Sequence, residues 1–392
     1  MARLIKFPVA SAFNNIKTHS NKSPQRFLHN SRTLKLTSRT HNPPHHRSPP
    51  LTASFFPLSA SSRMAALAIG AIILVGASIV KATKKSRNAE LRNTESALTR
   101  STSTTTTLVG NTQDIKMAEK QIPKNADDVI SIRNVTESGN VVTLSVPFLR
   151  FGSIPIGGRA TIVRLTSGAL AVFSPVDLTP KVEAKLAEMG GNVKYLIAPD
   201  IEHHIFLSKW ANAYPQAILI GPEGLPEKRE KMTEDYIGHE PFGVVFKAST
   251  KAETTISEEF DLDFSYEFVD AHATKELAFL YKPEKVLIEA DLIFNLPAIE
   301  QYENVLPADK PKPGVLARFF MRVQSTEGEA KGMKRLIWHA ISRGNRTGFN
   351  ESIARINAWD FDTIVPCHGE TIKGNGKEVF QKVFDWHING KK

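Results

Sequence analysis

The 392-residue sequence contains a single cysteine, Cys367. One thiol cannot form a disulfide within the chain, and it cannot supply the several thiolates of a Cys-rich zinc module. A disulfide-stabilised scaffold and a zinc finger are therefore excluded. Cys367 follows an apolar run, so we interpret it as a small buried side chain at a strand end; the alternative is a nucleophilic thiol.

Acidic residues are absent from the first 89 positions, which contain fourteen Lys or Arg residues. This segment accounts for the formal net charge of +10, because the remainder has 36 basic and 40 acidic residues. The rest of the chain is slightly acidic and has no basic stripe with interleaved aromatics. We therefore expect no nucleic-acid partner.

The N-terminal segment, residues 1–63, is basic and rich in Ser and Asn, and its first seven residues can form a short basic amphipathic helix. This composition is typical of a mitochondrial transit peptide. We expect a disordered leader with a targeting role; the alternative is an unstructured basic arm without one. Met117 offers a second possible start of translation, which would make the leader a variable extension.

One uncharged hydrophobic run covers residues 64–80, and four cations follow it between positions 81 and 87. Its 17 residues reach the lower limit of the ~17–25 needed to cross a bilayer. We predict one transmembrane helix and a single-pass membrane protein, mitochondrial in location, with the following domain weakly favoured on the cytosolic or matrix side. Residues 81–125 are polar and Ser/Thr-rich, which predicts a flexible tether.

Residues 126–392 alternate strand-like and helix-like patterns. Short apolar or β-branched runs at 141–146, 160–165 and 169–174 predict antiparallel hairpins. A helix is predicted at 179–189, with Thr179 as N-cap and Pro180 in its first turn. Further strands are predicted at 193–197, 217–220, 260–269, 276–281, 285–288 and 363–365, and further helices at 329–341, 351–359 and 377–388. Strands interleaved with helices make this an α/β domain.

Histidines and carboxylates follow four of these strands. The residues are Asp200, Glu202, His203 and His204 after the first, Asp270 and His272 after the second, Asp291 after the third and His368 after the fourth. If the sheets share one polarity, these side chains meet at one edge. Imidazoles and carboxylates together are typical metal ligands, so a metal site is predicted there.

The order of these clusters resembles the metallo-β-lactamase fold, and within it the divergent branch catalogued as DUF4336. The segment around Asp291 is similar to the family's Gly-Asp segment with its bridging aspartate. Residues 366–369 resemble the late Pro-Gly-His-Gly motif, and His272 falls where the family has its third motif. The resemblance implies a four-layer αββα sandwich over residues 141–388.

The first motif departs from the family's His-x-His-x-Asp-His. Aligning its last histidine on His204 places Pro199, Ile201 and His203 where two zinc ligands and an aspartate belong. The resemblance therefore implies a single divalent ion, zinc or iron, rather than a dinuclear zinc centre. Its implied ligands are His204, His272, Asp291 and His368. Asp200, Glu202 or His203 would serve as a substitute ligand or would orient or deprotonate a water molecule.

Two functions are compatible with this pattern. The first is a membrane-tethered, metal-dependent hydrolase of an ester, thioester, lactone or phosphoester. The second is a catalytically degenerate binding module of the same fold, anchored to a membrane; the altered first motif favours it. An insertion at residues 296–324, with adjacent Phe319 and Phe320, is expected to cover the pocket and select the substrate.

Overall fold

The structure is a computed structural model that describes residues 126–391. The leader, transmembrane helix and tether predicted for residues 1–125 lie outside the described residues, so membrane attachment and mitochondrial location remain predictions. Within residues 126–391, no helix has the length and apolar character needed to cross a membrane.

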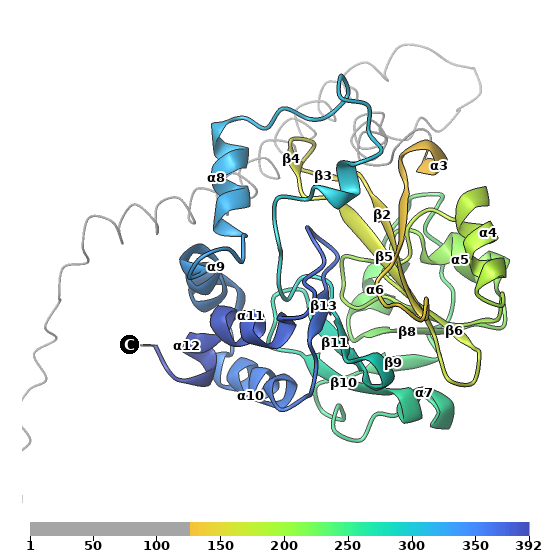
Figure 1. Ribbon diagram of the computed structural model, residues 1–392. Helices are drawn as coiled ribbons and strands as arrows, with labels where there is room; N and C mark the ends of the chain where they lie inside the picture. The colour runs from red at the N-terminus through yellow and green to blue at the C-terminus, as the bar shows by residue number, and fades with distance from the viewer. Residues whose placement is uncertain (1–125, 392) are drawn as a thin grey trace, which may run out of the picture. The chain divides into compact units, whose positions relative to one another are not determined.

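A seven-stranded sheet, whose strands Figure 1 shows mostly in yellow and green, has the first predicted cluster just after its strand β7. The first four strands in sheet order pair antiparallel, and β6, β7, β8 and β9 pair parallel. In sheet order they are β1 (Ser131–Asn134), β2 (Val141–Val146), β5 (Gly158–Arg164), β6 (Leu170–Phe173), β7 (Val193–Ile197), β8 (Ile218–Pro222) and β9 (Val244–Phe246). The hairpins predicted between residues 141 and 174 are confirmed.

A four-stranded sheet contains the later clusters. Its order is β10 (Phe264–Val269), β11 (Glu276–Tyr281), β12 (Val286–Ile288) and β13 (Thr363–Val365). The chain turns between β11 and β12 through the 3₁₀ helix η1 (Lys282–Glu284). β12 and β13 pair parallel, with Ile288 opposite Val365. Because parallel strands end at the same edge, Asp291 and His368 leave the sheet side by side.

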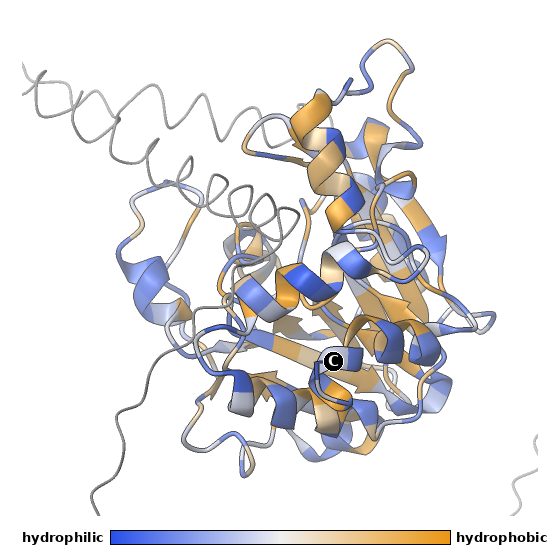
Figure 2. Cartoon of the chain, turned by 90° about the vertical axis from the view of Figure 1, so that its left-hand side faces the viewer, coloured by the Kyte–Doolittle hydropathy of each residue, from blue (hydrophilic) through white to orange (hydrophobic). Residues whose placement is uncertain are grey.

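The two sheets face each other across a core rich in aromatic side chains. Phe173 of the first sheet meets Phe279 of the second with ring centroids 5.0 Å apart, in an edge-on geometry that favours aromatic pairs. The strands are hydrophobic inside the domain, as Figure 2 shows by colour. Burial of these rings holds the sheets together and fixes the relative position of their edges.

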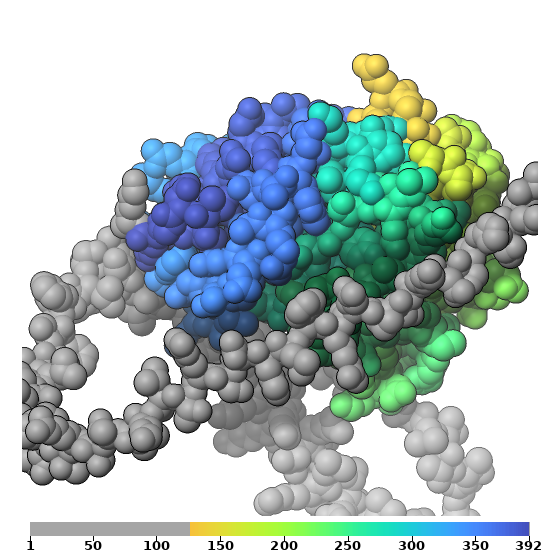
Figure 3. All heavy atoms as spheres, turned by 90° about the horizontal axis from the view of Figure 1, so that it is seen from below, coloured from red at the N-terminus to blue at the C-terminus, as the bar shows by residue number. Residues whose placement is uncertain are grey.

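Helices cover the outer face of each sheet. Val182 of α4 (Pro180–Glu188) and Trp210 of α5 (Leu207–Ala213) pack on the seven-stranded sheet. Phe349 of α10 (Arg346–Asn357) and Phe380 of α11 (Gly376–Val383) pack on the four-stranded sheet. In Figure 3 the C-terminal part of the chain, in blue, lies directly against the green part of the chain that contains β10 and β11. The described domain is thus layered helix–sheet–sheet–helix, and the predicted mixed α/β fold is confirmed.

The remaining elements are short. The helices are α3 (Ala126–Val129), α6 (Leu225–Glu230), α7 (Glu258–Asp263), α8 (Val315–Val323), α9 (Lys331–Leu336), the π-helical segment η3 (Ile337–Ile341) that continues α9, α12 (Asp385–Ile388) and the 3₁₀ helix η2 (Glu300–Tyr302). A small hairpin joins β3 (Leu149–Arg150) to β4 (Ile154–Pro155). The structure corrects the strand predicted from residue 260, because α7 occupies its first part. The Ser257 hydroxyl accepts a hydrogen bond from the Phe260 N–H, and acidic residues in the first turn favour the helix.

Trp210 connects helix packing to the edge of the sheet. Its side chain is fully buried, and its indole N–H donates a 2.7 Å hydrogen bond to the carbonyl oxygen of Val176. We expect Trp210→Phe to lower the free energy of unfolding by about 1–3 kcal/mol, because the ring is largely retained while a buried carbonyl loses its partner. Urea denaturation would measure the loss. An unchanged midpoint would show that this hydrogen bond does not contribute to stability.

Candidate metal centre

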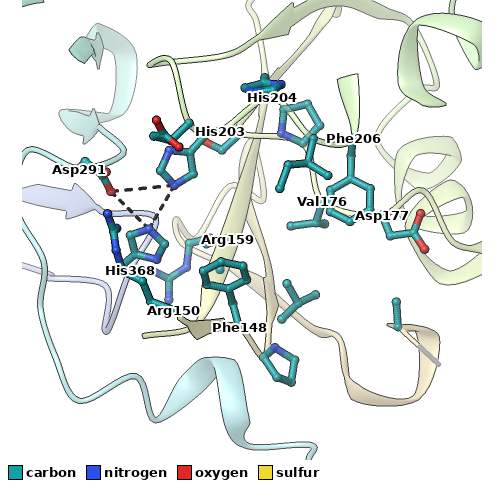
Figure 4. Close-up of a pocket in the computed structure, with 18 of the residues that line it drawn as sticks. Phe148, Arg150, Arg159, Val176, Asp177, His203, His204, Phe206, Asp291 and His368 are labelled. Carbon is teal, nitrogen blue, oxygen red and sulfur yellow. Dashed lines mark hydrogen bonds and ion pairs between the residues drawn. The ribbon is translucent and has the colours of Figure 1, made fainter. Parts of the chain in front are cut away.

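Three side chains converge at the shared edge of the two sheets. His203 follows β7, Asp291 follows β12 and His368 follows β13. The Nε2 atoms of the two histidines are 3.1 Å apart. The Asp291 Oδ1 atom is 3.3 Å from Nε2 of His368 and 4.0 Å from Nε2 of His203. Figure 4 shows the three groups pointing at one another.

Hydrogen bonds at the Nδ1 atoms of His203 and His368 determine whether their Nε2 atoms carry a proton or a lone pair. The Nδ1 atom of His368 is 2.6 Å from the carbonyl oxygen of Gly157, which can only accept. The Nδ1 atom of His203 is 2.9 Å from the Asp200 carboxylate, which also accepts the backbone N–H groups of Glu202 and His203. Both Nδ1 atoms are therefore donors. In the neutral rings, each Nε2 atom then carries a lone pair.

Two imidazole lone pairs and a carboxylate oxygen that meet in this way can hold a cation between them. The point equidistant from the three atoms lies about 2 Å from each of them, which is the usual ligand distance for zinc. These residues therefore form a candidate metal-binding group. Two imidazoles and a carboxylate suit zinc or ferrous iron. Hydrogen bonds to the outer ring nitrogens are the usual means of orienting such ligands.

The ionisation of the group follows from its charges. Burial alone would lower the pKa of His203, but the carboxylates of Asp200 and Asp291 outweigh burial and raise that pKa to about 9. Burial would raise the pKa of Asp291, but His203 and His368 hold it below its usual value. When no metal is bound, protonated His203 can therefore donate from Nε2 toward the acceptor atoms of His368 and Asp291. Because a metal requires neutral imidazole, binding would release this proton.

His204 is not part of this group, although it was one of the four expected ligands. Arg229 donates hydrogen bonds from Nη1 to the Nδ1 atom of His204, at 3.3 Å, and to its carbonyl oxygen, at 3.0 Å. Burial, together with the charges of Lys228 and Arg229, lowers the pKa of His204 to about 3. In Figure 4 its ring lies apart from the other two histidines. Arg229 holds His204 against the pocket wall, and the adjacent His203 points into the centre.

His272 is also outside the group of three. It is buried after β10, and its Nδ1 atom is 2.8 Å from the Thr274 hydroxyl. Its ring stacks on Phe349, with the centroids 6.2 Å apart. Its Nε2 atom has no hydrogen-bond partner within residues 126–391. The structure thus brings together Asp291 and His368 of the four expected ligands, and adds His203.

The loop that carries Asp291 is held by a buried carboxylate that the sequence interpretation did not single out. Glu276 of β11 accepts the N–H groups of Ala290, at 2.6 Å, and Asp291, at 3.1 Å. Burial and the neighbouring carboxylates, chiefly Asp200 and Glu289, raise the pKa of Glu276 well above its usual value. The sequence signal at this position is a carboxylate at the first residue of an otherwise apolar strand.

Cys367 lies next to His368 but faces away from the group. Its thiol is buried and contacts the Ser174 hydroxyl at 2.9 Å. Burial raises the thiol pKa well above its usual value. A protonated buried thiol is a poor nucleophile.

A cavity of about 310 Å³ opens beside the three converging residues. Apolar side chains form most of its wall, and Asp177, Glu202, Arg150 and Arg159 contribute charge. No residue of the predicted insertion at 296–324 lines it, which corrects the expectation that this segment covers the pocket. Phe320 and Met321 of α8 pack on the outer core of the second sheet instead. The apolar residues that line the cavity include Val146, Phe148, Phe151, Val176, Ile205 and Phe206.

Fold and site together define an α/β domain with a His–Asp–His group at the junction of two sheets. Residues 151–340 match the family described as "Domain of unknown function (DUF4336)". This part of the chain, which includes His203 and Asp291, therefore belongs to the DUF4336 family, as the motifs predicted. No curated protein matches the sequence.

Several solved structures are similar at low identity. A metallo-β-lactamase from Pontibacter korlensis is 11% identical, with a TM-score of 0.41, over 66% of this chain and 99% of its own. One from Hirschia baltica is 9% identical, with a TM-score of 0.40, over 66% and 97%. A flavo di-iron protein from Thermotoga maritima is 11% identical, with a TM-score of 0.40, over 68% and 62%. Because the sequence identities and TM-scores are this low, the assignment of a function depends on the chain's own residues.

Proposed function

We propose that the described domain is a metal-dependent hydrolase of the metallo-β-lactamase fold. One divalent ion, zinc or iron, is held by His203, Asp291 and His368. The proposal is based on the convergence of the Nε2 atoms of His203 and His368 with a carboxylate oxygen of Asp291. The helix–sheet–sheet–helix layers and the placement of the three residues at strand ends support the assignment to this fold.

The number of ligands favours catalysis over a purely structural role. Structural zinc sites are usually closed by four protein ligands, whereas catalytic sites have three and leave one position open. This group has three and borders a cavity. The ion would polarise a substrate oxygen and lower the pKa of a water molecule from 15.7 toward about 7.

The chain's own residues then have distinct tasks. Asp200 and Gly157 orient the two imidazoles through their Nδ1 atoms. His203, one of three residues expected to handle the proton, is assigned as a ligand. Glu202 lines the cavity, and Lys228 holds its carboxylate at 3.1 Å. We assign Glu202 as the group that accepts the proton of the attacking water. Esters, thioesters, lactones and phosphoesters are the proposed substrate classes.

Metal analysis of the purified full-length protein tests the proposal. The protein would be stripped with a chelator, loaded with zinc or, without oxygen, with ferrous iron, and analysed by mass spectrometry. We expect about one ion per chain and none in His368→Ala. The loaded protein would be assayed on p-nitrophenyl, thioester, lactone and phosphodiester substrates. Absence of bound metal would refute the hydrolase.

A binding module that has lost turnover is the second candidate. Its support is that His204 and His272, two of the four expected ligands, lie outside the metal group. Stoichiometric metal without turnover on any substrate class would favour this candidate over the hydrolase.

Asp200 provides a milder test of the same centre. We expect Asp200→Asn to lower metal affinity by roughly 10–100-fold, the usual effect of changing a group that orients a ligand. The amide oxygen of Asn can still accept the two backbone N–H groups, so the loop keeps its conformation. The substitution removes the negative charge of Asp200 beside the His203 ring. A chelator competition titration measures the affinity. Unchanged affinity would show that Asp200 does not orient His203 for a metal.

A further inference from the structure

Each charged side chain of the cavity wall has a partner of opposite charge, with one exception. Asp177 pairs with Lys209 at 2.7 Å, Glu202 with Lys228 at 3.1 Å, and the buried Arg159 with Glu300 at 3.2 Å. Asp291 lies 3.3 Å from His368 within the metal group. Arg150 is the charged residue of this wall that forms no ion pair within residues 126–391.

Arg150 is placed beside the metal group by the small hairpin. It ends β3, just before the turn at Phe151 and Gly152, where both residues have positive φ angles. Its guanidinium carbon lies 5.5 Å from the centre of the Phe151 ring. Figure 4 shows Arg150 on the same side of the cavity as Asp291 and His368. An unpaired cation thus borders the position of the reacting group.

We propose that Arg150 binds an anionic group, a carboxylate or a phosphate, on the molecule that occupies this cavity. The guanidinium presents two parallel N–H donors that match either group, and arginine is common where such groups are recognised. A divalent ion with Asp291 leaves one positive charge, to which Arg150 adds a second, so the cavity favours an anion. Treating this anion as a substrate rests on the proposed function.

The opposite wall indicates the rest of the ligand. Val176 and Phe206 present apolar surface on the side away from Asp291, as Figure 4 shows. The ring of Phe148, whose centroid lies 6.4 Å from that of His368, adds an apolar face next to the metal group. A volume of about 310 Å³ is at the small end of the ~300–1,000 Å³ of small-molecule sites. This space suits one short acyl or aryl group. The occupant is therefore a small amphipathic anion with its charge near Arg150.

A matched pair of probes tests this assignment: 4-phenylbutyrate and its neutral amide, 4-phenylbutyramide. Calorimetric titration of the full-length protein, both metal-free and zinc-loaded, measures their affinities. We expect the carboxylate to bind about tenfold or more tightly than the amide in both forms. Arg150→Gln should abolish this preference and Arg150→Lys should retain part of it. Arg318→Gln, an exposed arginine on α8 outside the cavity wall, should leave it unchanged.

The titration of the metal-free protein distinguishes two causes of a preference for the carboxylate: binding by Arg150 and coordination by the metal ion. A preference found in zinc-loaded protein alone, or one that survives Arg150→Gln, would overturn the proposal. Equal binding of the two probes to the parent protein would overturn it as well. If zinc fails to bind but the preference depends on Arg150, the anion site stands and the hydrolase does not. If zinc binds and esters are cleaved without any preference, the hydrolase stands and the anion site does not.

Discussion

His203→Ala is expected to lower the affinity for zinc by more than about 100-fold. Changing a group that only orients a ligand typically costs 10–100-fold, and loss of a ligand should exceed that range. His203 supplies one of the three converging atoms, and its Nε2 lies 3.1 Å from that of His368. Its removal leaves two protein ligands. Competition with a chelating dye would measure the affinity of the full-length protein.

His204→Ala is the matched control for this change. The two histidines are adjacent, and both line the cavity, but the Nδ1 atom of His204 accepts a hydrogen bond from Arg229. We expect His204→Ala to retain stoichiometric zinc, and circular dichroism would confirm that each variant is folded. Loss of zinc in His204→Ala with retention in His203→Ala would reverse the assignment and restore the alignment expected from the sequence.

Much of the fold could be predicted because its signals are local. Thr179 and Pro180 begin α4 as predicted, and the turn at 282–284 joins two antiparallel strands. The hairpin that carries Arg150 had no such signal, since its two strands contain only two residues each. Its position depends on contacts with distant parts of the chain, such as the hydrogen bond from the Tyr302 hydroxyl to the carbonyl oxygen of Phe148.

The site could be predicted in part for the same reason. Asp291 and His368 each follow a strand, and strand ends can be recognised in the sequence. The choice between His203 and His204 could not be made there, because both follow β7 in one loop. That choice depends on tertiary contacts, in which Asp200 accepts from one ring and Arg229, from α6, donates to the other. Adjacent residues of one type are separated only by the partners that folding brings to them.

Gly369→Ala is expected to destabilise the protein by more than about 3 kcal/mol and to weaken metal binding with it. Gly369 has a φ of +91°, and a Cβ atom there would lie 2.1 Å from the carbonyl oxygen of Asn295. The same loops are joined by hydrogen bonds from the Asn295 N–H to the His368 carbonyl, at 3.0 Å, and from the Glu370 N–H to the Asn295 carbonyl, at 2.9 Å. The clash would push the His368 loop away from the loop that follows Asp291.

Gly374→Ala separates this clash from backbone strain. Gly374 has a φ of +80° but no atom within 4 Å of its would-be Cβ, so the substitution costs only the strain of a positive φ, about 1–2 kcal/mol. Urea denaturation compares the two variants, and dye competition compares their zinc affinities. Equal stability losses would mean that the two loops are not in contact. A larger loss in Gly369→Ala, together with weaker zinc binding, would show that the contact between these loops holds His368 at the metal position.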